Sequence, residues 1–167
     1  MHASNFSYVD TVVATEALSG EEEAMWRAFV EVLTRLPRAL DEQFNRETGL
    51  TMTEYSVLVA LSEAADHELR ISELADVTAL SRSRISRVVD DMGRRLLVTR
   101  RKCQTDARSS FAVLTDDGLR ALESAYPGHL ARVRRLVLDH LTKSEVRTFT
   151  HAFGRVAEVL RGDLAGD

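Results

Sequence analysis

Residues 71–108 read ISELADVTALSRSRISRVVDDMGRRLLVTRRKCQTDAR. From residue 82 to residue 108 the chain carries nine lysines and arginines against three aspartates, a net charge of +6, whereas residues 1–81 sum to −10 and the whole chain to −4. A cationic segment on an otherwise anionic chain attracts a polyanion to one place and orients it there. The charge asymmetry therefore predicts a nucleic-acid-binding surface within residues 82–108.

The apolar residues of this stretch recur at helical spacing. They predict helices over residues 71–77 and 81–95, joined by the turn Thr78-Ala79-Leu80, which is a helix-turn-helix pattern. The expected shared core consists of Leu74, Leu80, Ile85, Val88, Val89, Met92 and Leu96. The helical repeat then turns the polar side chains of the second helix outward, namely Arg82, Ser83, Ser86, Arg87, Asp90 and Arg94.

The first two turns of the second helix are the part that enters the major groove in helix-turn-helix docking. Arginines in these turns can pair bidentately with guanine. Ser81 is predicted to cap the helix and to leave its positive end facing a phosphate. The candidate DNA-binding residues here are Ser81, Arg82, Ser83, Arg84, Ser86 and Arg87. The alternative is that the arginines only solvate an exposed helix, as isolated charge runs do.

A β-hairpin is predicted next, because residues 97–103 and 110–114 are short β-branched or alternating runs around the polar segment 104–109. It adds the candidate DNA-binding residues Arg100, Arg101, Lys102, Asp106 and Arg108. Asp106 is expected to hold the loop through Arg108 or a backbone amide, and Arg108 to reach the neighbouring minor groove. The alternative is that these two residues form an exposed ion pair of little energy.

Three short motifs follow one another here: Leu97-Val98-Thr99-Arg100-Arg101, Asp106-x-Arg108 and Leu114-Thr115-Asp116-Asp117-Gly118. Together with the helix-turn-helix they resemble the MarR family of winged-helix transcription regulators, over about residues 25 to 160. The resemblance implies an obligate homodimer with a triangular α/β body that binds palindromic operators and is commonly released by small phenolic or other aromatic ligands. The family usually has glycine where Leu96 stands. Glycine permits a positive φ at a helix end, so the wing is expected to begin at a different angle.

The rest of the chain predicts helices on both sides of this segment. Capping boxes at Ser19/Glu22 and Thr142/Glu145 mark the starts of a first and a last helix. The second helix is expected to follow Thr51 or Thr53, and Thr53 is placed as its N-cap. Pro37 is expected to bend the first helix without ending it. The predicted fold is mainly α with a small β-hairpin wing, divided into a mobile arm (1–18), an N-terminal helix (19–49), a winged helix-turn-helix lobe (50–114) and C-terminal dimerisation helices (115–167).

The C-terminal helices carry more apolar surface than a compact winged helix can cover. A second copy of the chain is expected to bury it, through Leu130, Val133, Val137, Leu141, Phe149, Phe153, Val156 and Leu160. A two-fold dimer would then set two recognition helices roughly 34 to 36 Å apart, one turn of DNA. The alternative is that these helices fold back into a monomeric core.

Apolar and aromatic residues of the first two helices mark a candidate ligand site: Trp26, Phe29, Val30, Leu33, Tyr55, Leu58 and Val59. In the family that the sequence resembles, this junction binds effectors, although aromatic residues at helical spacing are more often core. Cys103 is a second candidate switch, because the three preceding cations favour its thiolate and hence its oxidation; the alternative is an ordinary small strand residue.

Other classes of function lack support. The five histidines form no ligand set, so no metal and no cofactor is expected. An enzyme is not expected either, since a phosphate-binding glycine loop and a nucleophile elbow are both missing. The absence of a signal peptide and of a long apolar run predicts a cytoplasmic protein without a membrane partner. The remaining alternatives to a repressor released by an aromatic effector are a redox-responsive regulator and a winged-helix module that binds an acidic protein.

Overall fold

A computed structural model of the chain describes residues 17–102 and 110–165, and it describes side chains up to residue 162. The predicted N-terminal arm thus lies mostly outside the described residues, as do Cys103, Asp106 and Arg108. The chain divides into two compact units, Met1–Pro37 and Arg38–Asp167. In the first unit the described residues form the opening part of one helix, and the second unit holds all the other elements.

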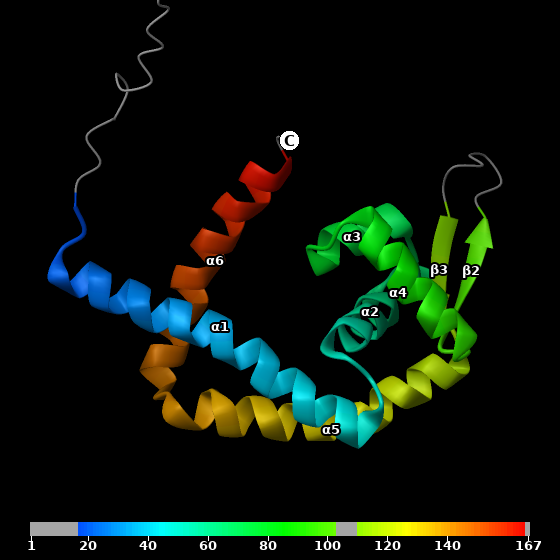
Figure 1. Ribbon diagram of the computed structural model, residues 1–167, viewed down its shortest axis with the longest axis horizontal. Coiled ribbons are helices and arrows are strands. Elements are labelled where there is room, and N and C mark those ends of the chain that lie inside the picture. The colour runs from blue at the N-terminus through cyan, green and yellow to red at the C-terminus, as the bar shows by residue number, and fades with distance from the viewer. Residues whose placement is uncertain (1–16, 103–109, 166–167) are drawn as a thin grey trace, which may run out of the picture. The chain divides into compact units, whose positions relative to one another are not determined.

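The described residues are mainly helical (Figure 1). The α-helices are α1 (Gly20–Thr48), α2 (Met52–Glu63), α3 (Ile71–Thr78), α4 (Arg82–Arg94), α5 (Asp116–Leu136) and α6 (Lys143–Ala165). Two short 3-10 helices, η1 (Ala65–His67) and η2 (Leu138–His140), and three strands, β1 (Glu68–Arg70), β2 (Val98–Lys102) and β3 (Ser110–Leu114), complete the set. None of the helices in the described ranges is long and apolar enough to cross a membrane.

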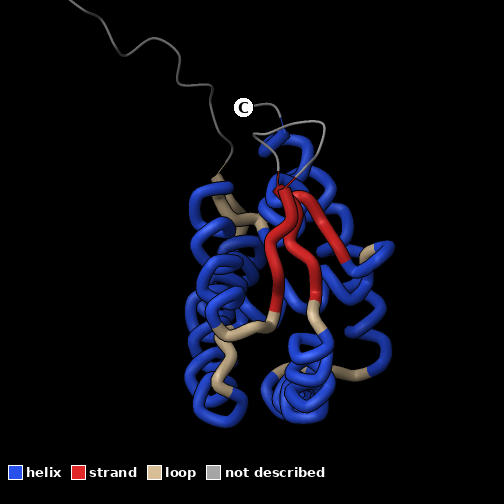
Figure 2. Tube along the Cα trace, turned by 90° about the vertical axis from the view of Figure 1, so that its right-hand side faces the viewer, coloured by secondary structure: helices blue, strands red, loops and turns tan. Residues whose placement is uncertain are grey.

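The strands form one antiparallel sheet in the order β1-β3-β2, and Figure 2 draws them side by side. The β2–β3 pairing confirms the predicted wing, with Val98 opposite Leu114 and Arg101 opposite Phe111. Strand β1 was not predicted. Three residues are too few to show a period of two, and the strand exists because β3 offers a free edge to pair with.

The helix starts follow their capping residues. The boxes at Ser19 and Thr142 are both present, with Glu22 and Glu145 bonded back to the cap amides at 2.8 and 2.7 Å. The prediction of Thr53 as the cap of α2 is wrong, because Thr51 caps this helix and accepts a bond from the Glu54 amide at 3.1 Å. Thr51 is the favoured N-cap because Glu54, three residues after it, completes the capping box.

The core of the second unit joins α2, α3 and α4 to the base of the wing. Its largest fully buried side chains are Phe44, Leu50, Leu58, Leu61, Leu74, Ile85, Met92, Val57, Val89 and Val98. Arg132 of α5, 5% exposed, holds the end of α1 by pairing with Glu47 at 2.8 Å and by donating to the Leu40 carbonyl at 3.5 Å. The predicted burial of Leu96 is wrong, since this side chain is 65% exposed.

Leu96 is exposed because of the way in which α4 ends. Its φ is +59°, in the left-handed region, so the side chain leaves the buried stripe. The amides of Leu96 and Leu97 bond back to Gly93 and Met92 at 3.0 and 3.1 Å, which completes a Schellman motif. Leucine thus adopts here the conformation that glycine adopts more easily, and Leu97 takes over the buried position.

The base of the wing is fixed by the start of α5. Thr115 caps this helix, accepting a bond from the Gly118 amide at 3.0 Å, and its hydroxyl donates to the carbonyl oxygens of Leu96 and Leu97 at 2.7 and 3.0 Å. A Cβ atom on Gly118 would lie 2.0 Å from the Leu97 carbonyl oxygen. The threonine and the glycine of the Leu-Thr-x-x-Gly motif therefore have distinct structural roles. Thr115 forms hydrogen bonds to the base of the wing, and Gly118 allows α5 to approach it closely.

Candidate nucleic-acid interface

The start of α4 gathers the predicted recognition residues on one surface. Ser81 is the N-cap, and its hydroxyl accepts a bond from the Arg84 amide at 3.3 Å. Arg82, Arg84 and Arg87 are all exposed, as is Ser83, whereas Ser86 is half-buried. Ile85 and Val89, on the opposite side of the same helix, are buried and hold it against the core. The predicted division between a buried stripe and an exposed basic face is therefore present.

Arg100 of β2 lies against α4. Its guanidinium donates to the Ser86 hydroxyl at 2.6 Å and pairs with Asp90 at 3.1 Å. This pair offsets the negative charge of Asp90, an exposed carboxylate of α4 that would repel a phosphate. It also fixes the base of the wing to the recognition helix by a charge-assisted bond, which is shorter and stronger than a neutral one.

Arg101 has a different environment, because successive side chains of a strand point to opposite faces. Its guanidinium binds both carboxylate oxygens of Glu68 in β1, at 2.5 and 3.1 Å, and its central carbon lies 4.5 Å from the centre of the Phe111 ring. Arg70 of β1 approaches the same ring at 5.0 Å. Arg101 thus stabilises the three-stranded sheet, a role that sequence reasoning missed because β1 was not expected.

The described part of the basic segment therefore sorts into two groups. Four arginines form ion pairs with nearby acids: Arg94 with Asp91, Arg95 with Glu54, Arg100 with Asp90 and Arg101 with Glu68. The other four cations are exposed and form no ion pair within residues 17–102 and 110–162, namely Arg82, Arg84, Arg87 and Lys102. These four are the cations free to meet a phosphate or a base edge.

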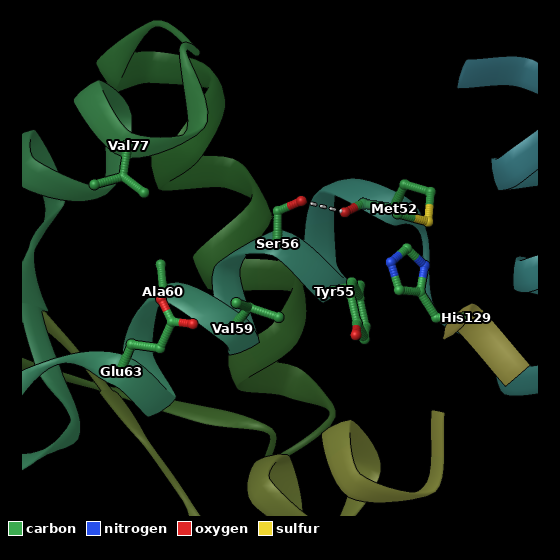
Figure 3. A pocket seen from close by; sticks show the side chains of 8 residues that line it. All are labelled: Met52, Tyr55, Ser56, Val59, Ala60, Glu63, Val77 and His129. Atoms are coloured by element: carbon green, nitrogen blue, oxygen red, sulfur yellow. Dashed lines mark hydrogen bonds between the residues drawn. The ribbon is translucent and has the colours of Figure 1, made fainter. Parts of the chain in front are cut away.

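A pocket of about 290 Å³ opens elsewhere in the second unit (Figure 3). Its lining comes from α2, α3 and α5 and consists of Met52, Tyr55, Ser56, Val59, Ala60, Glu63, Val77 and His129. Of the predicted ligand residues, it contains Tyr55 and Val59, whereas Leu58 is fully buried in the core. The other four predicted residues lie in the first unit, where Trp26, Val30 and Leu33 are exposed and Phe29 is half-buried.

His129 gives this pocket a polar group that sequence reasoning missed. Its ring packs on Tyr55, with centres 4.6 Å apart, and edge-on to Phe44 at 6.0 Å. Its Nδ1 atom is buried and has no hydrogen-bond partner within the described residues. Burial, and then the nearby Arg132 charge, lower the pKa of His129, while burial and then Tyr126 raise the pKa of Tyr55. Both groups are therefore neutral at pH 7, which suits an apolar ligand.

The predicted dimerisation residues run from α5 into α6. Five of them are exposed, at 38 to 54%: Leu130, Phe149, Phe153, Val156 and Leu160. Val133, Val137 and Leu141 are half-buried. The rings of Phe149 and Phe153 stack with their centres 5.4 Å apart. The second unit thus presents a row of large apolar side chains to the solvent along α6.

Comparison with known proteins gives a consistent result. The model of the MarR family matches residues 48–109. The HTH-type transcriptional regulator MhqR of Bacillus subtilis is 30% identical over 75% of this chain and 86% of its own length. Among solved structures, the MarR family regulator Sco3205 of Streptomyces coelicolor, in complex with DNA, has a TM-score of 0.83 and 36% identity over 87% of this chain and 91% of that one.

AbsC of Streptomyces coelicolor, another MarR family transcriptional regulator, has a TM-score of 0.81 and 38% identity over 89% of this chain and 99% of that one. These matches span the winged helix-turn-helix and most of the helices around it. The chain therefore belongs to the MarR family of winged helix-turn-helix transcriptional regulators, which are DNA-binding proteins and not enzymes.

Proposed function

We propose that this regulator is a homodimeric repressor that binds a palindromic operator through α4 and the wing and leaves it when a small aromatic effector binds. The observation that carries the proposal is the exposed basic surface at the start of α4, where three arginines without ion pairs among the described residues surround a capped helix end. A related protein, YetL of Bacillus subtilis, is a transcriptional repressor and is 29% identical over 71% of this chain.

The first turns of α4 are proposed to enter the major groove. Ser81 leaves the positive end of the helix open toward a phosphate, while Arg82, Arg84 and Arg87 reach base edges or the backbone. Lys102 is the last residue of β2 and is proposed to bind a phosphate beside the groove. Asp106 and Arg108, outside the described residues, keep their proposed roles in the loop and in the minor groove.

Dimerisation is proposed to bury the apolar row of α5 and α6. Monomeric proteins rarely expose large contiguous apolar patches, and such patches commonly mark an interaction surface. In a two-fold dimer each copy supplies the same surface, so two α4 helices would face successive major grooves on one side of the duplex. Replacing Phe153 with aspartate is expected to convert the dimer into monomers in analytical ultracentrifugation. A parent protein that sediments as a monomer would contradict this part of the proposal.

The effector is proposed to occupy the pocket beside His129. The lining is mostly apolar and contains the neutral imidazole of His129, whose Nδ1 has no hydrogen-bond partner among the described residues, and such a composition suits a small aromatic molecule. Val59→Trp fills the pocket without changing charge. A panel of simple phenols is expected to release the parent protein from operator DNA and to leave the variant bound. Equal release of the two proteins would place the effector elsewhere.

Selection from random duplex DNA tests the central proposal. The parent is expected to enrich an inverted repeat with half-sites about 10 base pairs apart, and its affinity should fall steeply between roughly 50 and 200 mM salt. Arg87→Ala should relax specificity at one position of the repeat, whereas Arg108→Ala should weaken binding evenly across sequences. Binding without any sequence preference would instead favour a module that binds an acidic protein.

A further inference from the structure

One arginine joins the ends of three helices. Arg95 follows the last residue of α4 and donates to a carboxylate oxygen of Glu54 in α2 at 2.8 Å. It also donates to the carbonyl oxygen of Gly49, just after α1, at 2.9 Å. Glu54 is itself only 9% exposed, and its other carboxylate oxygen accepts the Thr51 amide at 2.8 Å. The far end of α4 is thus bonded to the corner between α1 and α2.

We infer that Arg95 and Glu54 are positioning residues, which set the angle at which α4 presents its basic start to DNA. This inference rests on the proposed operator binding. It assigns to Arg95 a role different from that of a phosphate contact, although the residue lies within the basic segment. It assigns to Glu54 a favourable effect on DNA binding, although the residue is acidic.

Because α4 is long, a small change of angle at Arg95 displaces the start of the helix considerably. Thirteen residues of helix span about 20 Å, so a rotation of about 5° at the Arg95 end would move the Arg82 end by about 1.7 Å. Burial of Ile85, Val89 and Met92 holds the helix against the core, and the hydrophobic effect behind it is non-directional, whereas the Arg95 bonds are directional. Hydrogen bonds weaken steeply with distance and angle, so a shift of this size would remove bidentate pairing with a base.

Glu54→Gln distinguishes positioning from a simple effect of net charge, because the two predict opposite changes in the affinity for operator DNA. Removing a negative charge should strengthen binding to any DNA if only the net charge matters. Glutamine still has an oxygen to accept the Thr51 amide, but it loses the charge-assisted bond to Arg95. Positioning therefore predicts weaker binding to the selected operator, by about 3- to 30-fold, with affinity for an unrelated duplex unchanged.

Arg95→Lys gives the same test without a change of charge. A lysine cannot reach Glu54 and the Gly49 carbonyl with a planar fork, so the same operator-specific loss is expected. Arg94→Lys is the matched control, because Arg94 is exposed and pairs with Asp91 inside α4 itself. The control should bind operator as the parent does. All variants should keep the salt dependence of the parent, since no phosphate contact is removed.

The measurements are operator and unrelated-duplex affinities over a range of salt concentrations, with thermal unfolding to show that each variant is folded at the assay temperature. The inference is overturned if Glu54→Gln or Arg95→Lys binds operator as tightly as the parent, or if either loses affinity for both duplexes equally. Failure of the parent to select an inverted repeat would count against the proposed function instead. Selection by the parent together with unaffected variants would count against the inference alone.

Discussion

Gly118 is the residue whose replacement should most sharply test the packing of the wing base. The Cβ of an alanine there would lie 2.0 Å from the Leu97 carbonyl oxygen and 2.8 Å from Leu114 Cδ1. A carbon and an oxygen in close contact stand about 3.3 Å apart, so the backbones would have to separate by about 1.3 Å. The leucine side chain can move aside, but the carbonyl is part of the backbone of Leu97, the residue just before β2 of the wing.

This separation removes two hydrogen bonds that the Leu97 carbonyl accepts from Thr115, from its amide at 3.3 Å and from its hydroxyl at 3.0 Å. Their loss costs about 1–3 kcal/mol together, and overpacking costs about 1–3 kcal/mol more. The higher helix propensity of alanine stabilises the folded state by about 1 kcal/mol relative to glycine. Gly118→Ala should therefore lower the free energy of unfolding by about 3 kcal/mol and the melting temperature by about 6–12 °C.

The matched control is Gly93→Ala, in α4 and close to the same strand. Its new Cβ would meet the Val98 carbonyl oxygen at 3.8 Å, which is an ordinary contact, so its stability should be unchanged or raised by up to about 1 kcal/mol. Urea and thermal unfolding followed by circular dichroism, at one protein concentration, would give both values. If Gly118→Ala unfolds within about 0.5 kcal/mol of Gly93→Ala, the approach of α5 to the wing is not tight and the reasoning fails.

Three further changes test other parts of the structure. Burial lowers the pKa of His129 below its ordinary 6.5, so the unfolded chain binds that proton at a higher pH than the folded chain does. The resulting stability is present above about pH 6.5 and is lost as the pH falls through the folded pKa. His129→Gln should therefore reduce the fall in melting temperature between about pH 7.5 and 5, whereas the exposed control His151→Gln should not. Arg132→Ala should cost about 2–4 kcal/mol in urea unfolding, since it leaves a void beside Glu47, and Arg132→Met less than half as much; equal losses would mean that the volume of this side chain does not matter. Leu96→Gly should raise stability by about 0.5–1 kcal/mol, because it relieves the positive φ, and a decrease would argue against that conformation.

Helices and their starts could be read from the sequence because their signals are local. A capping box needs only a hydroxyl and a glutamate three residues apart, and the boxes at Ser19 and Thr142 formed as predicted. The buried stripe of α4 followed from a period of 3.6 residues. The cap of α2 follows the same local rule, because Thr51, and not the predicted Thr53, has a glutamate three residues after it.

Of the candidate site, the sequence predicted the exposed arginines of α4 but could not separate them from those that form ion pairs. The partners of Arg95 and Arg101 lie 41 and 33 residues away along the chain. Such pairs depend on which helices and strands meet, and charge counts along the chain contain no information about that. His129 was likewise passed over, because its neighbours Tyr55 and Phe44 come from other helices.

The sequence by itself determined the helix-turn-helix, the wing and the basic surface, because helical periodicity, caps and charge are properties of neighbouring residues. Tertiary structure alone decided that β1 pairs with β3, that Leu96 turns outward and that Arg95 joins three helix ends. Each of these depends on free energy gained between segments far apart in the chain. A short strand, a left-handed leucine and a half-buried ion pair are all unfavourable or neutral until the packed core brings their partners within reach.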